Sequence, residues 1–141
     1  MGNPKLIMQT EELSQFLKCE FPQLNDEFEI VQIGNGYCIL QFEADEKHLR
    51  PGGTVSGPAL FALADVAAYA AILAHIGPVA LAVTTNLNIN FLRKPAPGLI
   101  QGNAKILKLG KRLAIVEISI TARENDQLVA HAIATYSLPP C

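Results

Sequence analysis

One carboxylate stands alone in the most apolar segment of this 141-residue chain. From Pro58 to Ala74 nearly every side chain is apolar, and Asp65 is the only charged one. Charged side chains are rarely buried without a partner. A poorly hydrated carboxylate can act as a base or a nucleophile toward a carbonyl carbon, so Asp65 is a candidate catalytic residue. The alternative is a structural carboxylate that pairs across an interface.

Gly57, at the start of the same segment, is a candidate for the hydrogen-bond donor that such chemistry also needs. Its N–H lies in the first turn of the expected helix, where unpaired amides and the helix dipole favour a developing negative charge. The eight positions from Gly57 to Asp65 span about 12 Å along a helix. A base and an oxyanion donor must both lie within about 3 Å of the reacting group. The spacing therefore predicts a homodimer in which antiparallel helices form two shared sites.

The segment that carries both residues is predicted to be one long helix. Pro58 suits its first turn, because the missing N–H costs nothing there, and Gly77-Pro78 ends it. A helix of about nineteen residues would also span a bilayer. Asp65 would be costly in lipid, however, and the flanks carry no aromatic or basic anchors. We therefore expect a helix covered by protein on all sides, and no membrane partner.

Strand patterns flank this helix. Residues 83–92 alternate strictly, with Asn86, Asn88 and Asn90 on one face and Leu87, Ile89 and Phe91 on the other. Short turns such as Gly34-Asn35-Gly36 favour antiparallel pairing of the two strands that they join. The other expected elements are a helix at 10–21 capped by Thr10 and strands at 28–33, 37–44, 99–109, 112–123 and 128–138. Together they predict an α+β fold, one antiparallel sheet curled around the long helix.

Composition limits the class of protein. The chain is expected to form a single domain, 1–141, with an N-terminal helical segment at 1–25. Its net charge of −2 shows no excess of positive charge of the kind that indicates nucleic-acid binding. Cys19, Cys38 and Cys141 form neither a metal-ligand spacing nor a disulfide framework, and the start of the chain has no secretory pattern. These features predict a reduced, cytoplasmic protein without a bound metal.

The order of elements resembles the hotdog fold. The run from Gly53 to Pro58, followed by Leu63-Ala64-Asp65, resembles the signature of PaaI-like and 4-hydroxybenzoyl-CoA type acyl-CoA thioesterases. The segments Asn90-Phe91-Leu92 and Pro95-Ala96-Pro97-Gly98 also fit that family. The resemblance extends from about Phe28 to the end of the chain, and its motif is moderately specific.

The resemblance implies roles for individual residues. Asp65 is expected as the base or nucleophile, and Gly57 as the amide donor. The family's Ser or Thr on the next strand falls at Thr84, with Thr85 as the alternative if the register differs by one. Arg50 and Ser56 stand where the family usually has Asn and His, and Pro58 replaces a second Gly. Arg50, Ser56 and Thr85 are candidates for substrate binding, although Arg50 could pair with an acidic neighbour and Ser56 could cap the helix.

The function implied is an acyl-CoA thioesterase that releases a carboxylic acid and free coenzyme A. No cofactor is expected, since coenzyme A is part of the substrate. A homodimer, stacking into a homotetramer, is the expected assembly. The three substitutions near Gly57 keep open an acyl-thioester binding protein that does not hydrolyse its ligand. A hotdog dehydratase or hydratase is disfavoured because no histidine lies near Asp65 in the helix motif.

Two further sets of residues have less specific patterns. His48, His75 and His131 lack the spacing of a catalytic triad and are predicted to be structural. Basic residues near the turns are candidates for contact with coenzyme A phosphates, with a solvated surface as the alternative: Arg93, Lys94, Lys108, Lys111 and Arg112.

Overall fold

The computed structural model describes residues 4–22 and 27–140. Cys141, one of the three thiols considered above, lies outside these residues. The elements are α1 (Thr10–Glu20), β1 (Glu29–Gly34), β2 (Tyr37–Ala44), the short 3₁₀ helix η2 (Glu46–His48), α2 (Gly57–Ile76), β3 (Val83–Phe91), β4 (Gly98–Leu109), β5 (Leu113–Ala122) and β6 (Gln127–Ser137). Apart from η2, this is the predicted order of helix, two strands, long helix and four strands.

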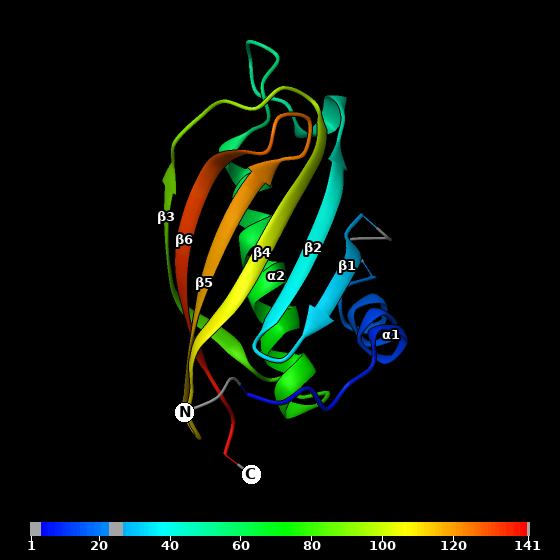
Figure 1. The fold of residues 1–141 in the computed structure, drawn as a ribbon, viewed down its shortest axis with the longest axis vertical. Coiled ribbons are helices and arrows are strands. Elements are labelled where there is room, and N and C mark those ends of the chain that lie inside the picture. Colours follow the sequence, from blue (N-terminus) through cyan, green and yellow to red (C-terminus); the bar gives the residue numbers. More distant parts are fainter. Residues whose placement is uncertain (1–3, 23–26, 141) are drawn as a thin grey trace.

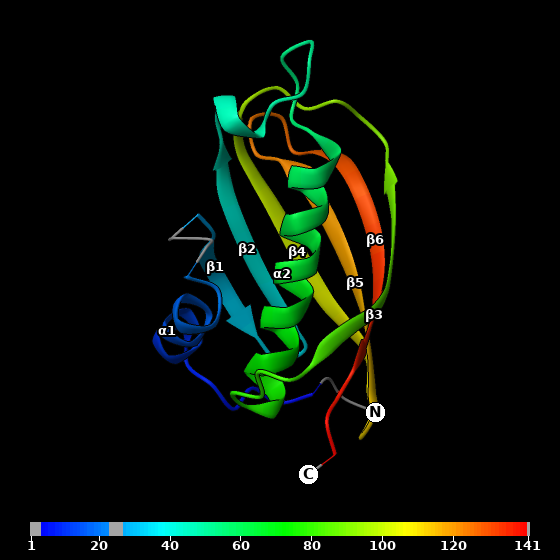
Figure 2. The same cartoon turned by 180° about the vertical axis from the view of Figure 1, so that it is seen from behind.

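The six strands form one antiparallel sheet in the order β1-β2-β4-β5-β6-β3. The sheet curves around α2, which lies along its concave face (Figures 1 and 2). Helix α1 packs beside β1 and against α2. The predicted α+β architecture is confirmed, and β1 and β3 are left as the two edges of the sheet.

Small side chains allow α2 to approach the sheet closely. Twelve of its residues are buried, half of them alanines, and β6 also buries three alanines, Ala130, Ala132 and Ala134. At Gly102 of β4, an added Cβ would lie only 3.1 Å from Leu63 Cγ of α2. By length and composition α2 would also cross a membrane. The face beneath the sheet packs as expected of a core helix, but Phe61 is 40% exposed, so this chain alone does not cover α2 on all sides as predicted.

The structure confirms the predicted end of one helix and corrects the predicted start of another. Gly77, with φ of 97°, ends α2, a backbone conformation that glycine adopts without strain. The N-cap of α1 is Gln9 and not Thr10, which is the first helical residue. The Glu12 carboxylate accepts the Gln9 amide hydrogen at 3.1 Å, so a residue inside the helix stabilises its start.

Strand β3 departs from strict alternation. Leu87 and Ile89 are partly buried, as predicted, but Phe91 is half-exposed. A β-bulge interrupts the pairing with β6 between Thr84 and Asn86. Because one extra residue reverses the alternation, the side chains before and after the bulge follow different phases.

Candidate functional site

The Asp65 side chain lies half-buried on α2, facing the end of the sheet formed by β3 and β6. Its Oδ1 accepts two hydrogen bonds, from Thr84 Oγ1 at 2.7 Å and from the Tyr136 hydroxyl at 2.6 Å. The same hydroxyl lies 3.0 Å from the Asp65 main-chain oxygen. No hydrogen bond reaches Oδ2 from residues 4–22 or 27–140. The two carboxylate oxygens therefore differ: one is held, and the other is available.

The sheet register brings the two donors together. Thr84 of β3 is paired with Tyr136 of β6, and cross-strand partners project on the same face. The bulge after Thr84 gives that residue an inward direction. Thr85 is the extra residue, and its hydroxyl donates to the Thr135 carbonyl oxygen at 3.1 Å. Of the two candidates on this strand, Thr84 is thus the one that contacts Asp65.

Tyr136 was missed by sequence reasoning. Its ring is buried, and burial followed by the nearby Asp65 charge raises the pKa of its phenol well above the ordinary value. The phenol therefore stays protonated at physiological pH and remains a hydrogen-bond donor. Alternation along β6 places Tyr136 on the inward face with Ala130, Ala132 and Ala134. A buried tyrosine hydroxyl requires a partner, which was the one available signal.

An open cleft of about 400 Å³ adjoins this carboxylate. Tyr69, one helical turn after Asp65, forms an aromatic wall with Tyr136, their ring centroids 6.2 Å apart. The remaining lining is apolar: Phe21, Val66, Ala80, Ala82 and Val83. Asp65, Thr84 and Tyr136 thus place a polar group beside a space suited to an apolar ligand.

The start of α2 is a second polar centre. Ser56 is the N-cap, and its Oγ accepts the Ala59 amide hydrogen at 3.2 Å. Leu60 N–H donates to the Ser56 carbonyl oxygen at 3.2 Å, and Pro58 has no N–H. The Gly57 N–H has no partner among the described residues, so it remains available to an external acceptor.

Gly57 borders a cavity of its own, about 290 Å³ in volume. Arg50, Arg93 and Lys94 line this cavity with Val55, Leu60, Phe91 and Leu92, so its rim is strongly basic. An added Cβ at Gly57 would meet the Phe91 ring at 3.4 Å. A methyl group there would make an ordinary van der Waals contact with the ring and would narrow the space beside the amide.

Within one chain, the predicted site residues fall into several separate places. Asp65 and Thr84 line one cavity, whereas Gly57 and Arg50 line the other. Ser56 borders a third cavity, with His48, and Thr85 lies at the exposed edge. None of these three cavities contains both Gly57 and Asp65, in agreement with their spacing on one helix.

The histidines have structural contacts. Buried His75 accepts the Gly36 amide hydrogen at 2.8 Å through Nε2 and contacts the Ala71 carbonyl oxygen through Nδ1. His48 contacts the Glu27 carboxylate, and His131 lies 2.8 Å from Glu117. In the described ranges, no group of three His, Cys, Asp or Glu side chains is arranged to hold a metal ion.

Comparisons with known proteins agree on one family. A family model described as "Thioesterase superfamily" matches residues 52–129, more than half of the chain. A candidate esterase from Saccharolobus solfataricus is 32% identical over 130 residues, covering 92% of this chain and 79% of the relative. A 1,4-dihydroxy-2-naphthoyl-CoA hydrolase from Listeria monocytogenes is 31% identical over 110 residues, covering 78% of this chain and 89% of the relative.

Solved structures extend the similarity over the whole fold. A crystal structure described as a candidate thioesterase from Silicibacter sp. TM1040 is 45% identical, with a TM-score of 0.90 over 98% of this chain and 96% of its own. The phenylacetic acid degradation protein PaaI from Thermus thermophilus, as a point mutant, has a TM-score of 0.74 over 84% of this chain and 99% of its own. At 24% identity, the latter is similar in fold alone.

Proposed function

Because the chain belongs to the thioesterase superfamily and has its hotdog fold, we propose that it hydrolyses acyl-coenzyme A with Asp65 as the catalytic carboxylate. Thioester hydrolysis is the activity that the family supports. The acyl-CoA substrate and the roles of individual residues are our proposal. The observation that carries it is the unequal environment of the two Asp65 oxygens beside an apolar cleft.

In this mechanism, Oδ2 of Asp65 faces the thioester carbonyl carbon. It acts either as the base that removes a proton from an attacking water, or as the nucleophile that forms an acyl-enzyme anhydride for water to cleave. Thr84 and Tyr136 hold Oδ1 and so fix the direction of Oδ2. In both routes the carbon–sulfur bond breaks and coenzyme A leaves as a thiolate.

The Gly57 amide stabilises the negative charge that develops on the carbonyl oxygen. Its N–H at the start of α2, without a partner in the described part of the chain, supports this role, and the helix dipole adds to the favourable field. Since Pro58 offers no second amide, Arg50 beside Gly57 is the candidate for a further donor. Arg50, Arg93 and Lys94 also suit the phosphates of coenzyme A, which would enter through this basic rim.

The two halves of the site come from different subunits of a dimer. Separate cavities for Gly57 and Asp65 support this arrangement. Edge strand β3 supports it as well, because none of the described strands pairs with its outer side, and Val83, Phe91 and Leu92 are half-exposed there. Pairing along this edge would satisfy its free backbone groups and cover these side chains. Antiparallel α2 helices would then bring Gly57 of one subunit to Asp65 of the other.

Replacement of Asp65 by asparagine tests the proposal. An asparagine side chain has nearly the same shape as aspartate, and its oxygen can still accept from Thr84 and Tyr136, so Asp65→Asn is expected to fold. Loss of the base is expected to reduce kcat by about 10²–10⁴-fold. Free thiol release from short, medium and aromatic acyl-CoAs measures this. Wild-type turnover in the folded variant would rule out Asp65 as the catalytic group.

The second candidate is an acyl-thioester binding protein that does not catalyse hydrolysis. Arg50, Ser56 and Pro58 favour it, because they replace the family's usual Asn, His and Gly around the amide donor. Saturable acyl-CoA binding without thiol release by the wild-type protein would select this function over the first.

A further inference from the structure

We propose that a small pocket beneath α1 receives the far end of the acyl group, so that Phe21 and Val66 determine the acyl lengths that the protein accepts. This inference rests on the proposed function, since it concerns the substrate of the same site. The ligand is a saturated, unbranched acyl chain that continues past the cleft beside Asp65.

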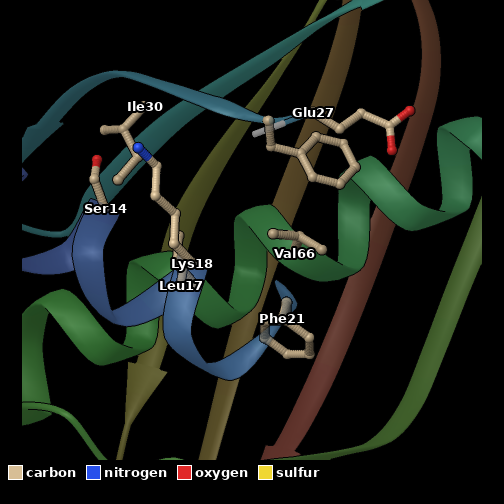
Figure 3. Close-up of a pocket in the computed structure, with 8 residues that line it drawn as sticks. Ser14, Leu17, Lys18, Phe21, Glu27, Ile30 and Val66 are labelled. Carbon is tan, nitrogen blue, oxygen red and sulfur yellow. The ribbon is translucent and has the colours of Figure 1, made fainter. Parts of the chain in front are cut away.

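The pocket has its own walls. It is a partly open pocket of about 50 Å³ between α1, the start of β1 and α2 (Figure 3). Leu17 comes from α1, Ile30 from β1 and Val66 from α2. The full lining is Ser14, Leu17, Lys18, Phe21, Glu27, Phe28, Ile30 and Val66. Five of these eight side chains are apolar and offer a surface suited to a hydrocarbon ligand, whereas the other three are polar or charged.

Phe21 and Val66 connect this pocket to the catalytic cleft, because both residues line both spaces. Val66 directly follows Asp65 on α2. A chain whose carbonyl carbon lies at Asp65 therefore reaches Val66 first and the α1 pocket next. Phe21 stands opposite as the residue that ends α1, with its N–H donating to the Leu17 carbonyl oxygen at 2.8 Å.

The Phe21 ring is held in place. It makes an edge-to-face contact with Tyr69, with the ring centroids 5.3 Å apart and the planes at 82°. Tyr69 is fixed in turn, since its hydroxyl donates to the Ala80 carbonyl oxygen at 3.3 Å. A ring supported in this way separates the pocket beneath α1 from the cleft beside Asp65. Removal of the ring would join these two spaces.

The size of the pocket limits the ligand. A cavity volume of about 50 Å³ accommodates a few methyl-sized groups and is too small for an aromatic ring. Each methylene that enters should raise the affinity roughly fourfold, because its apolar surface is removed from water. Acyl chains long enough to pass Val66 should be favoured up to the length that fills the pocket.

Two substitutions test the inference in opposite directions. Val66→Phe fills the passage and should lower the ratio of kcat/KM for octanoyl-CoA over butanoyl-CoA by about 15-fold, the value expected when roughly two methylenes are excluded. Phe21→Ala removes the partition and should move the preferred length to longer chains. The measurement is kcat/KM and Kd over saturated acyl-CoAs from acetyl to dodecanoyl, with thermal unfolding as the check on folding.

Phe16→Ala is the matched control. It truncates the same residue type on the same helix, yet Phe16 does not line the pocket. It should leave the length ratio unchanged. An equal shift in Phe16→Ala, or identical ratios for wild type, Val66→Phe and Phe21→Ala, would overturn the inference. If wild type releases no thiol, the thioesterase proposal fails, and the Kd series still decides whether the pocket selects chain length.

Discussion

At the scale of single residues, the central feature is a carboxylate with one oxygen held and one oxygen available. Tyr136→Phe removes one of the two donors to Asp65 Oδ1 while keeping the buried ring. A hydrogen bond to a charged group contributes about 1.5–3 kcal/mol, so kcat should fall by at least about tenfold. KM should change little, because the lost contact is made to Asp65 and not to substrate. Steady-state kinetics across one acyl-CoA series gives both values.

Tyr37→Phe provides the matched control for that prediction. The Tyr37 hydroxyl accepts from Gln32 Nε2 at 2.6 Å on the hairpin, outside both the cleft and the Gly57 cavity. It loses the same chemical group without a contact to Asp65 and should retain wild-type kcat. A Tyr136→Phe variant as active as Tyr37→Phe would show that the phenol has no part in orienting the carboxylate.

At the scale of elements, the start of α2 combines two roles in consecutive residues: Ser56 caps the helix, and Gly57 presents a free amide. Ser56→Ala removes the acceptor for the Ala59 amide and should lower the free energy of unfolding by about 1 kcal/mol. Ser56→Thr, which keeps a hydroxyl, should recover most of that loss. Urea unfolding of the three proteins measures it.

This prediction separates the two roles considered for Ser56. If the hydroxyl binds substrate and does not cap α2, Ser56→Ala should raise KM and leave the urea midpoint unchanged. The structure supports the cap, because the Ser56 hydroxyl oxygen accepts the Ala59 amide hydrogen.

At the scale of the whole molecule, a site shared between subunits predicts complementation. Asp65→Asn lacks the carboxylate, and Gly57→Ala places a methyl group beside the amide, where it meets the Phe91 ring. Each variant alone should be strongly impaired. Unfolded together and refolded as a mixture, half of the dimers should combine both chains and contain one intact site of two, restoring about a quarter of the wild-type activity.

Activity of the mixture no higher than the mean of the two separate variants would contradict a shared site and place both groups within one chain. Light scattering on the same samples adds an independent check. The active species is expected to be a dimer or a larger assembly, and a stable active monomer would also contradict the proposal.

Much of this protein followed from local sequence signals. The apolar run between Pro58 and Gly77 was enough to identify the core helix, because only a helix covered by protein tolerates such composition around one carboxylate. The position of Asp65 marked the candidate catalytic group, and its distance from Gly57 indicated two separate centres. The first follows from a lone charge in an apolar run, and the second from the helical rise, which is the same in every helix.

The contacts around Asp65 were decided by tertiary structure. Strict alternation places Thr85, and not Thr84, on the face of Leu87 and Ile89, and the β-bulge reverses that phase. Tyr136 lies 71 positions from Asp65 and reaches it only because β6 pairs with β3 beside the helix. Bulges and strand partners depend on how distant segments pack together, and no short stretch of sequence contains that information.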